Sequence, residues 1–272
     1  MNLSLILVNK MHKLDFFTQK RLSFTFFVLI LIGLTYATVI YTEYNVAKGF
    51  TSIPKAIRWA TANFYPDAAS LKKLPTILLK LRDTILMSVA SATIASFCAF
   101  FVAILGAQTT RINVWFSVIA RGIATLFRNI DVSAWALILL FSFGQSSFTG
   151  YFALFFVTFG FMVRVLIETI DEVSTDSVEA LRATGASYFA IIAQSVIPSC
   201  LPQLVSWVLF MIETNIRSAT LVGILTGTGI GYSFDIYYKS LNYHAASLVI
   251  VVIVLSVFAI EAVSNRIRRA VL

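Results

Sequence analysis

The residues that could do chemistry within an apolar segment lie close together between Glu213 and Thr220. Glu213 and Arg217 are one helical turn apart with the acid first, which is the favourable order for an ion pair within a helix. The polar residues Asn215 and Ser218 belong to the same stretch. We expect this group toward the outer part of a membrane span, where charges must be paired or face a cavity. Two interpretations stay open: the pair neutralises itself inside a helix bundle, or one of its charges faces a polar pathway.

Glycines follow this group at positions 223, 227, 229 and 231. A glycine string can cradle the phosphates of a nucleotide where it follows a strand, but this one lies between two apolar segments. Nucleotide binding is therefore not predicted here. Gly229 and Gly231 are expected to allow a tight or re-entrant turn and a close approach of helices that line a cavity.

The second polar region is residues 171–198, a hydrophilic interruption between two long apolar runs. Asp176 followed by Glu179 has the spacing of a capping box, which predicts a helix that begins at Asp176 or Ser177. Gly185 is expected to interrupt this helix, and Pro198 is expected to break the chain before the next span. From these residues alone, the region is an ordinary connector with two short helices on one side of the membrane.

The elements that must position these residues are membrane-spanning helices. The chain is 58% hydrophobic and 12% charged over 272 residues, and its mean hydropathy is +0.86. This composition is too apolar for a soluble domain and predicts an all-α polytopic membrane protein. Six spans are predicted, at about Leu22–Tyr41, Thr84–Leu105, Asp131–Phe143, Gly150–Ile170, Ser199–Leu221 and His244–Ser264. The third is short, so it either begins within Val114–Phe127 or forms a broken helix.

The distribution of Lys and Arg predicts the orientation. Basic residues precede the first span, follow the second and end the chain, namely Lys10, Lys13, Lys20, Arg21, Arg111, Arg121, Arg128, Arg266, Arg268 and Arg269. Both termini and residues 171–198 are then cytoplasmic. The predicted outer loop, residues 42–83, is also basic and disagrees with this rule, although long loops obey it less well. Within it, Ile53–Phe64 is expected to be an interfacial helix.

The predicted organisation is therefore a cytoplasmic tail at 1–21 and one transmembrane domain at 22–272. The net charge of +8 fits flanking residues that contact anionic lipid, and no basic patch typical of nucleic-acid binding is present. The sequence contains no phosphate-binding GxxxxGK[ST] motif and no catalytic triad or paired-acid pattern, so no enzymatic activity is predicted. His12 and His244 are isolated, and Cys98 and Cys200 suit helix packing.

The region 171–198 resembles the EAA loop of ABC importer membrane subunits. The matching residues are Glu179, Ala180 and Leu181, then Gly185, and finally the pair Ile197 and Pro198, with Leu181 in place of the second alanine and Ser195 in place of an isoleucine. In that family the loop forms a coupling helix that docks on a cytoplasmic ATPase. The resemblance implies a type I importer permease fold, in which Glu179, Ala180, Leu181, Arg182, Gly185 and Pro198 transmit ATP-driven motion.

From about Phe64 to the C-terminus, the chain resembles the phosphonate importer permeases more closely than other importers. The segments that carry this resemblance are VEALRATGAS at 178–187, ETNIRSAT at 213–220, TGTGIG at 226–231, and RNI and WAL at 128–130 and 135–137. The departures are Thr226 and Thr228 in place of glycine and Asp131 in place of proline.

This resemblance implies a homodimeric permease in the cytoplasmic (inner) membrane, supplied with a phosphorus oxyanion by an extracytoplasmic binding protein. ATP and Mg²⁺ would be used by a separate ATP-binding subunit, with no cofactor bound by this chain. Arg217 suits bidentate recognition of phosphonate oxygens, and Arg164 is a second candidate, although snorkelling explains it better. The implied pathway residues are Glu213, Asn215, Arg217, Ser218, Thr220, Gly229 and Gly231. The alternatives are a permease for an amino acid, phosphate or sulfonate, an ion-coupled secondary transporter or channel, and a structural membrane scaffold.

Overall fold

The computed structural model describes residues 16–271, which are almost entirely helical and contain no strand. They form two structural units that meet at Ala62 and Asn63. The first unit holds α2 (Phe16–Tyr41) and nearly all of α3 (Val46–Asn63). The second holds α4 (Ala68–Leu71), α5 (Leu74–Gly106), α6 (Val114–Asn129), α7 (Val132–Phe143), α8 (Ser147–Val173), α9 (Thr175–Ala183), α10 (Tyr188–Ile191), the π-helix η1 (Ile192–Val196), α11 (Ile197–Thr226), α12 (Gly229–Lys239) and α13 (Tyr243–Val271).

The first unit contains the first predicted span and the predicted interfacial helix. α2 is long and apolar enough to cross a membrane, and it begins at Phe16 rather than at Leu22, so it takes in the end of the predicted tail. Lys10, His12 and Lys13 lie outside the described residues. α3 begins where the Asn45 side chain accepts a hydrogen bond from the Lys48 amide, and it extends the predicted helix by about two turns toward the N-terminus.

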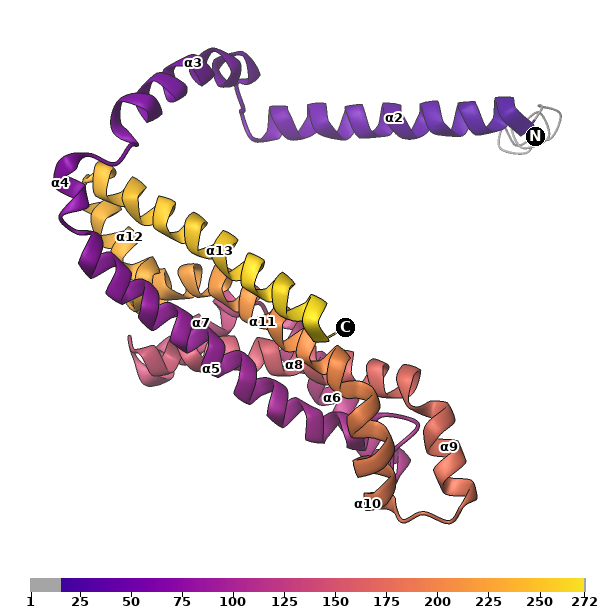
Figure 1. Ribbon diagram of the computed structural model, residues 1–272. Helices are drawn as coiled ribbons and strands as arrows, with labels where there is room; N and C mark the ends of the chain where they lie inside the picture. Colours follow the sequence, from indigo (N-terminus) through magenta and orange to yellow (C-terminus); the bar gives the residue numbers. More distant parts are fainter. Residues whose placement is uncertain (1–15, 272) are drawn as a thin grey trace, which may run out of the picture. The chain divides into compact units, whose positions relative to one another are not determined.

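The second unit is built around α5, α8 and α11, which pack on one another along much of their length. Figure 1 shows α9 and α10 at one end of this unit, and α4 and α12 at the other. The face of α5 toward the bundle is made of small side chains that let neighbouring helices approach closely: Ser88, Ser91, Ala92, Ala95, Ser96, Ala99 and Ala103. The end of the unit that carries α4 also holds His244, whose ring lies 2.7 Å from the Tyr65 carbonyl oxygen.

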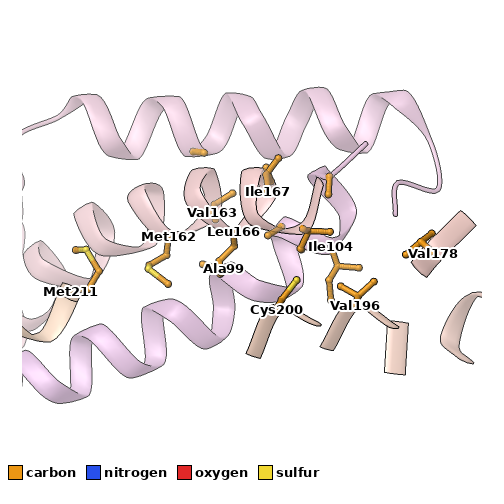
Figure 2. Packing of buried hydrophobic residues seen from close by; sticks show 14 of the residues in the cluster. Ala99, Ile104, Met162, Val163, Leu166, Ile167, Val178, Val196, Cys200 and Met211 are labelled. Carbon is orange, nitrogen blue, oxygen red and sulfur yellow. The ribbon is translucent and has the colours of Figure 1, made fainter. Parts of the chain in front are cut away.

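A buried apolar cluster links the membrane helices to the short helices at the α9 end. It runs from Met211 and Met162, through Leu166 and Ile104, to Val178 of α9 (Figure 2). Val178, Val196 and Cys200 are fully buried within it. The cluster makes α9 part of the packed bundle rather than a loose connector.

The third predicted span is a broken helix, which is one of the two alternatives that the sequence left open. α6 and α7 meet at an angle of 89° across the short break that follows Asn129. Asp131 takes an extended conformation there and accepts a hydrogen bond from the Ser133 amide at 2.8 Å, so it is the N-cap of α7. The family that the chain resembles has proline at this position. Within residues 16–271, five helices are long and apolar enough to cross a membrane, and this pair brings the number to six if it forms one span, in agreement with the six that the sequence predicts.

The glycines after α11 form a sharp turn into α12, as the sequence predicts. Gly227 ends α11 in the left-handed region at φ +69°, and a β-carbon on Gly231 would lie 1.9 Å from the carbonyl oxygen of Thr220. Thr84 of α5 secures the turn, because its hydroxyl accepts a hydrogen bond from the Ile230 amide at 2.9 Å. The segment is therefore a close helix–helix contact.

We predict that Gly231→Ala lowers the thermal unfolding temperature of the detergent-solubilised protein. The added methyl group collides with the backbone of α11, and overpacking of this kind costs about 1–3 kcal/mol. Gly122→Ala is the matched control, because nothing lies within 4 Å of a β-carbon on this helical glycine. Alanine there is expected to be neutral or to stabilise α6 by up to about 1 kcal/mol. Equal unfolding temperatures for the two variants would contradict the close contact between α11 and α12.

Candidate functional site

The helix that carries Glu179 begins one residue earlier than expected, and Asp176 is not its N-cap. α8 runs to Val173 and α9 starts at Thr175, with only Ser174 between them in a near-helical conformation. The chain never leaves the helical region before Asp176, so that residue cannot adopt the extended conformation of a capping residue. The capping-box prediction is wrong for this reason, and Asp176 lies instead in the first turn.

The end of α9 is where the sequence places it. Gly185 has φ +78° and donates its amide to the carbonyl of Arg182 at 3.0 Å, while Ala186 donates to the carbonyl of Leu181 at 3.1 Å. This pair of bonds is a Schellman motif, which requires a residue in the left-handed region after the helix. Leu181 and Ala186 both pack against the buried cluster, so the bend has a fixed direction.

α9 is joined to the membrane helices on one side and exposed on the other. Val178 is fully buried, and the hydroxyl of Ser177 lies 2.6 Å from that of the buried Ser195 in η1. Ser195, which replaces an isoleucine of the family that the chain resembles, thus makes the polar contact with Ser177. The opposite face of α9 exposes Glu179, Ala180 and Arg182.

A polar network ties α9 to the end of α8, to the middle of α6 and to the loop that follows α5. The carboxylate of Asp171 accepts hydrogen bonds from the amide and the hydroxyl of Thr109, at 2.9 and 2.6 Å, and its other oxygen lies 3.6 Å from Arg121. Arg182 in turn donates to the carbonyl of Thr109 at 2.6 Å. A pocket of about 360 Å³ opens between this network and Glu179. Sequence reasoning missed the network because its members lie far apart in the chain.

Pro198 does not break the chain, contrary to the expectation. The helical path runs from Tyr188 to Thr226 through the π-helical turn η1. The Ile197 amide bonds to the carbonyl of Ile192 in this wider turn, directly before the proline that has no amide to donate. Pro198 therefore lies in the first turn of α11, where proline is tolerated.

The predicted ion pair within α11 is present and has a third member. Arg217 lies 3.3 Å from one carboxylate oxygen of Glu213, and Arg268 from the last turn of α13 lies 3.9 Å from the other. Glu213 is only 12% exposed at its side chain, whereas Arg217 is 52% exposed. The group lies near the middle of α11 and level with the C-terminal end of α13. No membrane boundary fixes the depth of this group, so its expected position toward the outer part of the span stays a prediction.

Asn215 forms a separate, buried hydrogen-bond node among three helices. Its amide nitrogen donates to Ser91 of α5 at 3.2 Å and to Thr158 of α8 at 2.9 Å, and Thr158 donates back to the amide oxygen at 3.1 Å. The residue is only 3% exposed. Its side chain thus holds α5, α8 and α11 together and is not available to Arg217.

Of the remaining predicted pathway residues, Thr220, Gly229 and Gly231 lie where α11 turns into α12. The Thr220 carbonyl faces Gly231, and its buried hydroxyl has no hydrogen-bond partner among residues 16–271. Gly229 has φ +60° and lies against Thr84, while Ser218 is half-buried. The structure therefore divides the predicted pathway set into an ion cluster, a buried node and a helix contact. Arg164 lies apart from all three and pairs with Glu168 one turn later in α8.

We predict that Asn215→Ala destabilises the protein. The change leaves the buried Thr158 hydroxyl without a partner, and interhelical hydrogen bonds in membranes are worth about 0.6–2 kcal/mol each. A double-mutant cycle with Thr158→Val measured by thermal unfolding isolates the pair, because the double variant should lose less than the sum of the single losses. Strict additivity would show that the two side chains do not interact.

Comparison with known proteins is consistent with the helical architecture. Residues 95–271 match the family described as "Binding-protein-dependent transport system inner membrane component". A protein of Stutzerimonas stutzeri named "Putative phosphite transport system permease protein HtxC" is 30% identical over 220 residues, which are 81% of this chain and 77% of that protein. A protein of Escherichia coli K12 named "Putative cryptic phosphonate transport system permease protein PhnE2" is 32% identical over 117 residues, which are 43% of this chain and 96% of that protein.

Among solved structures, the inward-facing MetNI methionine ABC transporter shares the fold. The similarity has a TM-score of 0.63 and 22% sequence identity, and it covers 72% of this chain and 96% of the other. At this level of identity, the likeness concerns the fold alone. The predicted type I importer permease fold is confirmed.

Proposed function

The chain belongs to the family of binding-protein-dependent transport system inner membrane components, and we propose that it imports phosphonate or a related phosphorus oxyanion. It is the membrane-spanning subunit of an ABC importer. The solute is delivered by an extracytoplasmic binding protein. ATP and Mg²⁺ are used by a separate cytoplasmic subunit, so the covalent chemistry of hydrolysis takes place outside this chain.

The observation that carries the proposal is the structure of α9. Its inner face is fixed to the bundle through Val178 and Leu181, and its outer face exposes Glu179 and Arg182. A helix of this kind can transmit force, because a push on its exposed face moves the packed helices α8 and α11 with it. The network around Asp171 extends this connection to α5 and α6.

The chemistry of the solute is supported by the two relatives whose names refer to phosphite and phosphonate transport. Both solutes are small oxyanions, which need positive charge or N–H donors on a path of low dielectric constant. Arginine is suited to this task because its planar guanidinium binds two oxygens at once. Weak binding is sufficient in the permease, since a deep energy well would slow release.

The proposed assembly is a homodimer in the cytoplasmic membrane, with the pathway between two copies and one ATPase bound to each α9. Both termini then face the cytoplasm, as the Lys and Arg distribution predicts. The exposed apolar side chains of α5, α7 and α13 supply the surface for lipid and for the second copy, among them Phe97, Phe101, Phe141, Leu255 and Phe258.

We predict that Glu179→Arg weakens ATPase association by about tenfold, which corresponds to roughly 1.4 kcal/mol. The change reverses a charge on the exposed face of α9 and leaves its buried anchor Val178 intact. Co-purification of the ATPase with the permease measures the effect. Asp83→Arg is the matched control, because Asp83 lies near the opposite end of α5 and pairs with its neighbour Arg82. If Glu179→Arg retained both ATPase association and uptake, the coupling role would be refuted, and an ion-coupled transporter would be favoured.

We also predict that a phosphonate- or phosphite-loaded binding protein stimulates ATP hydrolysis by the complete complex in proteoliposomes, with uptake of the same solute. Methionine-, sulfonate- and phosphate-loaded binding proteins serve as the comparison. Stimulation by a methionine-loaded binding protein, and by neither phosphorus oxyanion, would replace the proposed solute with an amino acid.

A further inference from the structure

We propose that Arg128 and Arg164 form a polar binding site for the transported oxyanion at the break between α6 and α7. The inference rests on the proposed function and assigns a place to its solute. The two arginines come from different helices and line one pocket of about 240 Å³ together with Ala124, Thr125 and Asn129. This volume is below the range of about 300–1,000 Å³ that is usual for drug-sized ligands, and it suits a small anion.

The pocket opens on the surface of the single chain, beside the middle of α8 rather than at the C-terminal end of that helix. A β-carbon on Gly160 would lie 2.6 Å from the backbone nitrogen of Arg128, so the end of α6 lies against the middle of α8. At about 1.5 Å per residue, Gly160 is roughly 20 Å from the end of α8. The hydrocarbon core of a bilayer is about 30 Å thick, which places the break well inside it.

Non-helical backbone cannot face lipid at this depth, because its amides and carbonyls would have no hydrogen-bond partner. The last carbonyls of α6 have no partner within the helix, and the break interrupts the regular bonding between Asn129 and Val132. Trp135 donates to the carbonyl of Phe127 at 3.4 Å and satisfies one of these groups. Exposed non-helical backbone is tolerated inside a membrane only against protein or a water-filled cavity. Asn129 and Asp131 are exposed in the single chain, so this face is expected to line water or a second copy.

The charges favour an anion. Arg128 makes no ion pair within residues 16–271, and its guanidinium lies 6.0 Å from the ring centre of Phe161, which holds it toward α8. Arg164 pairs with Glu168 one turn later in α8, and neither Glu168 nor Asp131 lines the pocket. Asp131 instead accepts a hydrogen bond from the Ser133 amide. The site therefore keeps one unpaired positive charge, at Arg128, with the Asn129 amide group beside it. The Thr125 hydroxyl donates its proton to the Arg121 carbonyl at 2.7 Å and is not a donor for the anion.

This arrangement differs from the ion cluster on α11. Arg217 and Arg268 share the carboxylate of Glu213, so an anion bound there would compete with this carboxylate for the two arginines. At Arg128 no such competition exists among the described residues. Snorkelling explains Arg164 taken singly, but it does not explain why Arg164 lines the same pocket as Arg128 at the break in a span.

The first test is uptake of methylphosphonate and phosphite by the complete complex in proteoliposomes. Arg128→Gln is expected to lower uptake at least tenfold while ATPase association is retained, and Arg128→Lys is expected to be intermediate because it keeps charge but loses bidentate binding. Arg269→Gln, an exposed arginine in the last turn of α13, is the matched control and should transport normally. Unchanged uptake in an Arg128→Gln, Arg164→Gln double variant would overturn the site.

The second test does not depend on transport. Asn129→Cys is placed in a chain whose Cys98 and Cys200 are replaced by alanine, and its reaction with a membrane-impermeant, charged thiol reagent is timed. The expected rate is at least tenfold above that of Leu255→Cys, which lies in an exposed apolar stretch of α13, and methylphosphonate should slow it. A rate no higher than that of Leu255→Cys would overturn the water-lined site, whatever the uptake results. If the unmodified complex takes up no phosphorus oxyanion, the proposed function is refuted. If it takes up the oxyanion but the oxyanion does not slow labelling of Asn129→Cys, the proposed binding site is refuted and the proposed function stands.

Discussion

The constraint on which the rest of this structure depends is that the bilayer core provides no water to satisfy a backbone polar group. In α5, α8, α11 and α13, long helices meet this requirement, because the amides and carbonyls of a helix interior bond to one another within the same segment. The interruptions are informative because each needs a specific local solution. Asp131 caps one new helix, and Thr84 receives the amide of another across a helix contact. The sites argued above lie at or beside such interruptions.

The mechanical side of the molecule follows from how its short helices are attached. A coupling element is useful only if displacement of its exposed face moves the membrane helices, and this requires a rigid joint. Val178 supplies the apolar part of that joint, and Asp171 supplies the polar part by joining α8 to Thr109 and Arg121. Packed interiors resist compression, so a push on α9 is passed to α8 and α11 rather than absorbed. The π-helical turn before Pro198 joins α10 and α11 into one continuous helical segment.

The charged side chains within the membrane region fall into two groups with different consequences. Glu213 lies between Arg217 and Arg268 and connects α11 to the end of α13. Its burial means that loss of the carboxylate would leave two arginines without a counter-charge, which makes the cluster a structural joint as much as a candidate pathway. Arg128 has no such partner among the described residues and lies at a helix break, where an approaching anion can supply the missing charge.

Local patterns in the sequence were sufficient to predict the fold class, a total of about six spans, the bend at Gly185 and the glycine turn after α11, because these depend on local hydropathy and on conformations that only certain residues adopt. The sequence also identified the ion pair of Glu213 and Arg217, since helical spacing alone brings them together. It misplaced the start of α9, because the capping residue depends on where the preceding helix stops. The packing of helices that are distant in the chain was needed to show that Asn215 is a buried joint, that Arg268 reaches Glu213, and that Arg128 and Arg164 share a pocket. Each of these depends on which faces of distant helices pack together, and local sequence carries no record of that choice.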